Sequence, residues 1–296
     1  MRFVNPRNDL AFKKIFGDEQ RKEILISFLN AVLDLPPHQA IVDITILNPY
    51  QVPPVEILKY SLLDIQATDQ QGNRFIIEMQ IEYVAAFLKR FLYYTARAYT
   101  DQIKPGDDYN LLQRVIFIGV LDYSAFAEDP HYLNSHVFLN RRTHSHLLRD
   151  LEFHFIELPK FTLAEHELVQ TVDKWIYFIK HAADLAIIPE SADFAALRSA
   201  YEVANQFSWS EADLQAYEKR WIMIHDERSR HRTAEERGRE RGLQEGVVLG
   251  EARRSQEIAR QMLAEGMDHA RIARLTGVSS AERAILTTAA QSNPCS

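Results

Sequence analysis

The chain has 296 residues, of which 46% are hydrophobic and 25% are charged, as in an ordinary soluble globular protein. Its apolar runs are shorter than the roughly 20 residues that span a bilayer, and its start lacks the apolar core of a signal peptide. The net charge of −7 does not favour nucleic-acid binding by the whole surface, so any such site must be a local patch. The single cysteine, Cys295, has no internal disulfide partner, so we expect a cytoplasmic protein with no membrane partner.

The first predicted element is a helix that begins at Asn8, whose side chain can accept hydrogen bonds from the free N–H groups of the first turn. Pro36 and Pro37 interrupt the helical pattern, because proline has no N–H to donate. Residues 40–47 then predict a first strand. The expected buried face of the helical region consists of Leu10, Phe12, Ile15, Phe16, Ile24, Leu25, Phe28 and Leu29.

Two apolar runs, residues 58–67 and 74–82, flank a turn rich in Asp, Gln, Gly and Asn, which predicts an antiparallel hairpin. Side chains alternate along a strand, so Glu78 and Gln80 are expected on one face and Met79 on the other. Strands with these bounds can place Asp64 beside Glu78.

Two carboxylates at one sheet edge, Asp64 and Glu78, with Gln80 beside them, are typical of a site for a hard divalent cation such as Mg²⁺. A metal held there can activate water and stabilise charge on a phosphate. The alternative is that all three residues are solvated on the outer face of the hairpin. The acids alone do not decide between these interpretations.

Residues 84–103 predict a long amphipathic helix, and residues 114–123 are a continuous apolar run of the kind found in buried strands. Further strands are expected at 134–140 and 151–158. The predicted order therefore begins helix, strand, strand, strand, helix, strand, which is compatible with several α/β folds.

Three helices are predicted next, near residues 164–182, 191–206 and 210–230, and we expect the globular domain, residues 1–228, to end there. Residues 229–256 are highly charged and contain a glycine at every fourth position from Gly238 to Gly250. We interpret this segment either as a half-formed helical linker or as a helix whose glycine stripe lets a second helix or a nucleic-acid backbone approach closely.

The tail, residues 257–290, predicts three short helices at 258–264, 269–275 and 280–287, separated by turns at Gly266 and Gly277. Its pattern is that of a helix-turn-helix-like module. The alternative is a small helical cap or an oligomerisation element, through which the chain would form a homo-oligomer.

The stretch Asn8-Asp9-x-x-Phe12-Lys13-x-x-Phe16-Gly17 resembles the opening motif of the Rpn family, the recombination-promoting, transposase-like nucleases of the PD-(D/E)xK superfamily. Asp64 with Glu78-x-Gln80 resembles the active-site core of that family, in which Gln replaces the usual Lys. The glycine repeat and the sequence ARLTGVS in the tail are also similar, so the resemblance covers nearly the whole chain. It implies an α/β fold with a restriction-endonuclease-like core, a mixed central sheet flanked by helices, and an all-helical C-terminal extension.

The resemblance also implies a Mg²⁺-dependent endonuclease that acts on double-stranded DNA and is associated with DNA recombination or mobile elements. Asp64, Glu78 and the backbone carbonyl of Met79 would hold the metal. Asp9 would be an extra acid that positions water.

Gln80 departs from the superfamily pattern. An amide takes no proton at neutral pH, so Gln80 could orient water or bind phosphate but could not act as a base. Lys13 or Lys59 would then supply the missing positive charge. This departure concerns the catalytic rate rather than metal binding.

Two other classes of function remain open: a catalytically weak DNA-binding or partner-binding protein of transposase origin, and a helical interaction scaffold built on the tail. The predicted helix at 84–103 also carries aromatic and basic residues that could bind phosphate or stack on DNA, or simply pack on the sheet. They are Arg90, Tyr93, Tyr94, Arg97 and Tyr99.

Five histidines are clustered between residues 131 and 154. They lack the spacing and the cysteine partners of a zinc site, so His144 and His146 are expected in a solvated loop.

Overall fold

The computed structural model of the chain describes residues 2–48, 65–83 and 86–279. It divides into two compact units, Met1–Ile224 and His225–Ser296. The first unit contains the sheet, and the described part of the second is helical. No helix within the described ranges is long and apolar enough to cross a membrane.

The described strands form one mixed sheet in the order β1-β2-β3-β4-β6-β5. The central strands β3, β4 and β6 are parallel, whereas the pairs β1–β2, β2–β3 and β5–β6 are antiparallel. β4 is buried along its whole length, as its continuous apolar run predicted. The predicted mixed α/β core is therefore confirmed. The strands are β1 Ile44–Ile46, β2 Ile65–Asp69, β3 Arg74–Gln80, β4 Val115–Leu121, β5 Leu133–His136 and β6 Leu151–Glu157.

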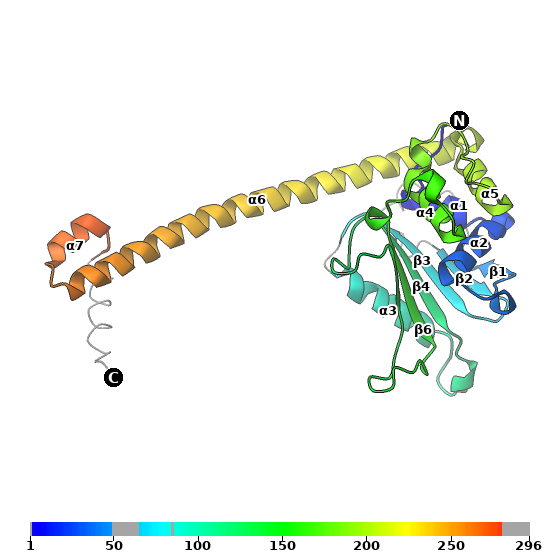
Figure 1. Cartoon of the computed structure of the whole chain (residues 1–296), viewed down its shortest axis with the longest axis horizontal. Helices are drawn as coiled ribbons and strands as arrows, with labels where there is room; N and C mark the ends of the chain where they lie inside the picture. Colours follow the sequence, from blue (N-terminus) through cyan, green and yellow to red (C-terminus); the bar gives the residue numbers. More distant parts are fainter. Residues whose placement is uncertain (1, 49–64, 84–85, 280–296) are drawn as a thin grey trace. The chain divides into compact units, whose positions relative to one another are not determined.

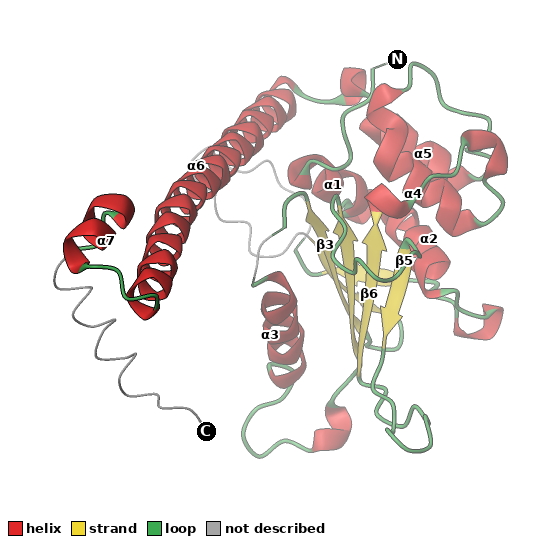
Figure 2. Ribbon diagram, turned by 60° about the vertical axis from the view of Figure 1, so that its left-hand side comes forward, coloured by secondary structure: helices red, strands yellow, loops and turns green. Residues whose placement is uncertain are grey.

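Helices cover both faces of this sheet (Figures 1 and 2). On one face α3 packs over a small aromatic cluster, and on the other face α1, α2, α4 and α5 enclose the larger core. The side chains of β3 follow this division, because Ile77 and Met79 belong to the larger core while Ile76 belongs to the α3 cluster. These helices are α1 Asp9–Phe16, α2 Lys22–Leu33, α3 Phe87–Thr100, α4 Thr171–His181 and α5 Ala195–Ala204.

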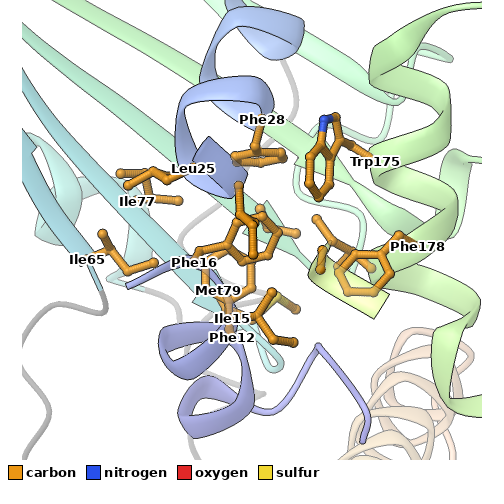
Figure 3. Close-up of a cluster of buried hydrophobic side chains, with 14 of the residues drawn as sticks. Phe12, Ile15, Phe16, Leu25, Phe28, Ile65, Ile77, Met79, Trp175 and Phe178 are labelled. Atoms are coloured by element: carbon orange, nitrogen blue, oxygen red, sulfur yellow. The ribbon is translucent and has the colours of Figure 1, made fainter. Parts of the chain in front are cut away.

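The first helix is fixed at both of its ends. Asn8 caps α1 as predicted, since its side-chain oxygen accepts a hydrogen bond of 3.0 Å from the backbone N–H of Leu10. At the other end Phe16 packs against Phe28 of α2 and Trp175 of α4, with ring centroids 5.0 Å and 5.7 Å apart (Figure 3). Large buried rings contribute much of the free energy of a core, so these contacts hold α1 against α2 and α4.

The predicted hairpin is present as β2 and β3. Ile65 pairs with Ile77 at the described end of the ladder. In the turn, the carboxylate of Asp69 accepts hydrogen bonds of 2.9 Å from the backbone N–H groups of Gln71 and Asn73. The turn thereby sets the strand register, which decides which side chains of β3 face α3.

The strand predicted at 134–140 is shorter than expected. β5 ends at His136, and the chain then makes a tight loop in which the carbonyl of Asn140 accepts a hydrogen bond of 2.8 Å from the N–H of His144. His144 has a positive φ of 54°, a conformation that a continuing strand does not contain.

The helix predicted near 164–182 begins only at Thr171. The carboxylate of Asp173 accepts a hydrogen bond of 3.1 Å from the backbone N–H of Gln170, which fixes the N-terminus of α4 at this point. The preceding residues form a separate short 3₁₀ turn, Glu165–Glu167.

In the second unit the glycine repeat does not interrupt the helix. α6 runs without a break over Glu211–Ala264, and residues 229–254 are all exposed. The short helix predicted at 258–264 is therefore the end of α6, because the surrounding residues are strong helix formers that outweigh about 1 kcal/mol of propensity lost at each glycine. α7, His269–Thr276, packs its Ile272 against Ala259 of α6. The helix predicted at 280–287 lies outside the described residues.

Candidate active site

Glu78 is a buried acid on the face of the central sheet that packs against α3. It stands on β3 beside Gly119 of β4, and only 5% of its surface is exposed. Gly119 has no room for a side chain, since an added Cβ would lie 3.0 Å from the ring of Phe155 and 3.1 Å from that of Phe117. The acid is thus held next to a tightly packed aromatic layer, and the alternative of a solvated hairpin residue is wrong for Glu78.

Gln80 lies on the same face as Glu78, as predicted from strand alternation, and its amide Nε2 donates a hydrogen bond of 2.7 Å to Oε2 of Glu78. Among the described residues, no other group donates a hydrogen bond to this carboxylate. Met79 points to the opposite face, where its side chain is buried in the larger core (Figure 3). The predicted metal ligand from Met79 is its backbone carbonyl oxygen, together with the carboxylates of Asp64 and Glu78.

The surroundings of Glu78 disfavour its charged form. Burial raises the pKa of Glu78 from 4.5 to about 7, against the opposing effects of the Gln80 hydrogen bond and the charge of Arg90. The nearby carboxylate of Asp9 raises it further. A buried acid that titrates near neutral pH beside a second acid is an arrangement found at functional sites more often than in structural cores.

Asp9, the first residue of α1, lies close enough to Glu78 for its charge to act on this acid, and its predicted role in positioning water stays a prediction. Its carboxylate is held by Arg220 of α6: Nε of Arg220 lies 2.9 Å from both carboxylate oxygens, and a terminal guanidinium nitrogen lies 2.6 Å from one of them. Arg220 was not predicted from the sequence. The two residues are 211 positions apart, and no local pattern connects them.

The remaining predicted site residues have different outcomes. Lys13 lies in the last turn of α1, half-buried, and its side chain makes no hydrogen bond or ion pair within the described part of the chain. Asp64 and Lys59 lie outside the described residues, so the pairing of Asp64 with Glu78 stays a prediction. Within the described ranges, no three His, Cys, Asp or Glu side chains are grouped as a metal site.

A tyrosine hydroxyl that sequence analysis did not single out lies close to Glu78. The Tyr123 hydroxyl is buried, and within the described residues it has no hydrogen-bond partner. Burial raises the pKa of Tyr123, and the charges of Arg90 and Glu78 both act on it. The Tyr123 ring contacts Tyr83 and Phe87 edge to face, at 5.6 Å and 6.1 Å between centroids.

A second buried acid, Glu157, lies on the same face of the sheet at the end of β6. Its carboxylate accepts four hydrogen bonds: from the backbone N–H groups of Ala125 (2.6 Å) and Phe126 (3.1 Å), from the Asn134 amide (2.9 Å) and from the ammonium group of Lys160 (2.5 Å). This acid has all the partners that it needs inside the protein.

The histidine cluster is only partly the solvated loop that was expected. His144 is exposed, but His146 is half-buried and its Nε2 lies 4.0 Å from a carboxylate oxygen of Glu152. His154 lies 3.8 Å from the other oxygen of Glu152, and its Nδ1 is 2.8 Å from the hydroxyl of Ser135. These side chains lie on the face of the sheet opposite Glu78, because Glu152 and His154 alternate with Phe153 of the α3 cluster.

The family profile described as PD-(D/E)XK nuclease family transposase matches residues 6–234, a range that includes α1, the hairpin, α3 and Glu78. The chain therefore belongs to this family of PD-(D/E)XK nucleases. A second profile, the C-terminal helix-turn-helix domain of the Rpn/YhgA-like nuclease family, matches residues 253–284 and makes the chain an Rpn-type member. Both matches confirm the resemblance predicted from the sequence. Searches of the curated proteins and of the solved structures gave no match.

Proposed function

We propose that this protein is a Mg²⁺-dependent endonuclease that hydrolyses phosphodiester bonds in DNA, with Glu78 at its active site. The observation that supports this best is the environment of Glu78, a buried carboxylate with one hydrogen-bond donor among the described residues and a pKa raised to about 7. A divalent cation would stabilise its negative charge, which the described surroundings leave largely uncompensated. Hard oxygen donors of this kind are the ligands that Mg²⁺ prefers.

The proposed ligands are the carboxylates of Asp64 and Glu78 and the backbone carbonyl of Met79. Bound Mg²⁺ supplies Lewis acidity, which favours deprotonation of the attacking water and stabilises charge on the phosphate. Gln80 orients the carboxylate of Glu78 through its amide N–H groups, and its amide oxygen is left to accept a hydrogen bond from water. Asp9 adds negative charge near the site, and Arg220 holds it in place.

A helix-turn-helix domain is a DNA-binding module, and its match at the end of the chain supports DNA as the substrate. The proposed role in recombination or in mobile elements follows from the transposase family alone. Self-association through the exposed part of α6 remains a proposal for the second unit.

The test is incubation of the purified full chain with supercoiled plasmid, with Mg²⁺ and with EDTA. We expect Glu78→Gln and Asp64→Ala each to reduce nicking about a hundred-fold or more, since loss of even the outer partners of metal ligands costs roughly 10–100-fold. Calorimetric titration with Mg²⁺ should show weaker binding by both variants. A Glu78→Gln variant that nicks DNA as fast as the parent would show that the active site is elsewhere.

A second function is supported by one observation. Gln80 stands where the resemblance places the lysine of the superfamily, and among the described residues Lys13 forms no hydrogen bond or ion pair with Glu78. The chain would then be a catalytically weak DNA-binding or partner-binding protein. Plasmid that is bound but not cut, with and without Mg²⁺, would favour this function.

A further inference from the structure

The outer surface of α3 combines positive charge with exposed apolar side chains. The helix buries a narrow stripe, Phe87, Phe91 and Thr95, against the sheet. Two neighbouring rows at four-residue spacing face solvent instead. We call these rows the α3 face: Leu88, Leu92 and Ala96 in the first, and Lys89, Tyr93 and Arg97 in the second.

The charge of α3 sets it apart from the rest of the chain. The protein as a whole carries a net charge of −7, yet α3 contains Lys89, Arg90 and Arg97 and no acidic residue. Arg97 pairs with Asp101 after the helix end, at 3.3 Å, in a pair that is exposed on both sides and therefore weak. Lys89 and Arg90 have no ion-pair partner within the described residues. A polyanion is the class of partner that such a helix fits.

The apolar members of the α3 face are more exposed than a solvated helix requires. Tyr93 is 60% exposed, and Leu88 and Leu92 are nearly half exposed. A tyrosine ring at a basic surface provides a flat, sequence-tolerant stacking contact for nucleic-acid bases, and neighbouring leucines add apolar contact area. In uninterrupted duplex DNA the base faces are stacked inside, so only unpaired bases can use such contacts.

The first turns of α3 lie next to the candidate active site. The charge of Arg90 acts on Glu78, and Phe87 in the first turn of α3 contacts the Tyr123 ring. Tyr83, which is 64% exposed, also contacts the Tyr123 ring. Glu78 lies on the face of the sheet that packs against α3, so a strand bound along α3 passes near it at the first turns of the helix. Figure 2 shows α3 beside this sheet.

We propose that the α3 face binds an unpaired DNA strand and directs it to Glu78, so that the substrate is DNA with a single-stranded stretch rather than uninterrupted duplex. The Tyr93 ring stacks on a base, Leu92 packs against it, and Lys89, Arg90 and Arg97 contact phosphates. This inference rests on the proposed nuclease function for the place where the strand leads, but binding by α3 is independent of cleavage.

The experiment measures binding of the full chain to labelled oligonucleotides of about 30 nucleotides by fluorescence anisotropy. EDTA is present so that no cutting occurs. The probes are a single DNA strand, the blunt duplex of the same sequence, and the RNA strand of that sequence. The variants are Tyr93→Ala and Tyr93→Phe, with Tyr109→Ala as the matched control. Tyr109 is also a strongly exposed tyrosine, but it lies outside α3 in the short 3₁₀ helix Tyr109–Leu111.

We expect Tyr93→Ala to weaken binding of the DNA strand by about five-fold or more and to leave duplex binding unchanged, because one lost base stack costs roughly 1–3 kcal/mol. Tyr93→Phe should retain binding, since it keeps the ring. Tyr109→Ala should behave as the parent. Because Tyr93 is exposed, circular dichroism should show the same fold for all variants.

Several results would overturn the proposal. Equal strand binding by Tyr93→Ala and Tyr109→Ala would exclude base stacking at α3, and tighter binding of the RNA strand would exclude DNA as the preferred ligand. A change of oligomeric state in Tyr93→Ala by light scattering, without a change in strand binding, would make the α3 face a contact between copies of the chain. The outcome is separable from the proposed function, because Glu78→Gln should still bind the strand while losing plasmid nicking.

Discussion

Glu78 and Glu157 are two buried acids on the same face of one sheet, and their surroundings are opposites. Glu157 is fully buried and accepts hydrogen bonds from two backbone N–H groups, an amide and a lysine. Glu78 accepts a hydrogen bond from Gln80 alone among the described residues, and Asp9 adds a like charge nearby. The described part of the fold therefore supplies Glu157 with four hydrogen bonds and Glu78 with one. Burial alone therefore does not distinguish the two acids, whereas the number of described hydrogen-bond donors does.

The largest change in stability is expected when Glu157, the acid with four hydrogen-bond donors, is replaced. Glu157→Gln removes the charge partner of Lys160, whose side chain is only 11% exposed. Leaving a buried charge unpaired costs about 3–5 kcal/mol, so we expect a loss of this size in the free energy of unfolding, measured with urea. The double variant Glu157→Gln with Lys160→Met removes both charges and should recover part of the loss. A single variant as stable as the parent would contradict the structural role of Glu157.

At Glu78 we expect the opposite effect on the free energy of unfolding, because replacing this acid should stabilise the protein above neutral pH. Its folded pKa is raised from 4.5 to about 7, so its contribution to stability is fully present below pH 4.5 and is lost as the pH rises through 7. In EDTA the parent should therefore lose up to about 3 kcal/mol between pH 4.5 and pH 8, by the conversion of pKa shift to free energy. Glu78→Gln should remove this part of the pH dependence and be the more stable protein at pH 8. Urea unfolding at pH 5 and pH 8 makes the comparison, and unchanged pH dependence in the variant would contradict it.

Replacing Arg220 should change the surroundings of Glu78 with a smaller effect on stability. Arg220→Gln removes the partner of Asp9, so the uncompensated carboxylate should raise the pKa of Glu78 further. We expect a loss of about 1–3 kcal/mol at pH 7, the usual size for a hydrogen-bonded charge, and a pH transition displaced upward. Asp9→Asn in the Arg220→Gln background should reverse the displacement. A double-mutant cycle that gives no coupling energy would show that the pair does not act on the site.

The smallest effect is predicted for Gln80. Gln80→Ala removes the one donor to Glu78 found among the described residues but no proposed metal ligand. We expect Mg²⁺ binding to persist by calorimetry while plasmid nicking slows by about ten-fold, within the range for outer partners of metal ligands. Complete loss of Mg²⁺ binding would instead make Gln80 a ligand.

The sequence predicted those parts of the fold and site that depend on local patterns. Alternation along β3 correctly placed Glu78 and Gln80 together and Met79 on the opposite face, and the Asn8 cap correctly predicted the start of α1. These features follow from the period of a strand and from the free N–H groups of a first helical turn.

The contacts that distinguish the two acids could not be read from the sequence. Arg220 reaches Asp9 across 211 positions, and Asn134 and Lys160 meet Glu157 from different segments. Such pairs form only when the sheet and its helices are assembled, so no local period reveals them. The continuity of α6 was missed for a different reason, because glycine propensity was given more weight than the helix formers around it.

The start of the chain depends on residues made much later. The backbone N–H of Val4 donates to the carbonyl of Ala204, and the N–H of Asn5 donates to the hydroxyl of Tyr217. Asp9 forms its ion pair with Arg220. At about 5–20 residues per second, a ribosome needs on the order of 10–40 seconds to supply these partners. During synthesis the N-terminal motif is therefore without its closing contacts, and the acids near Glu78 gain their final arrangement only once the beginning of α6 has emerged. For a nuclease-family protein this order of events delays assembly of the site until most of the polypeptide exists.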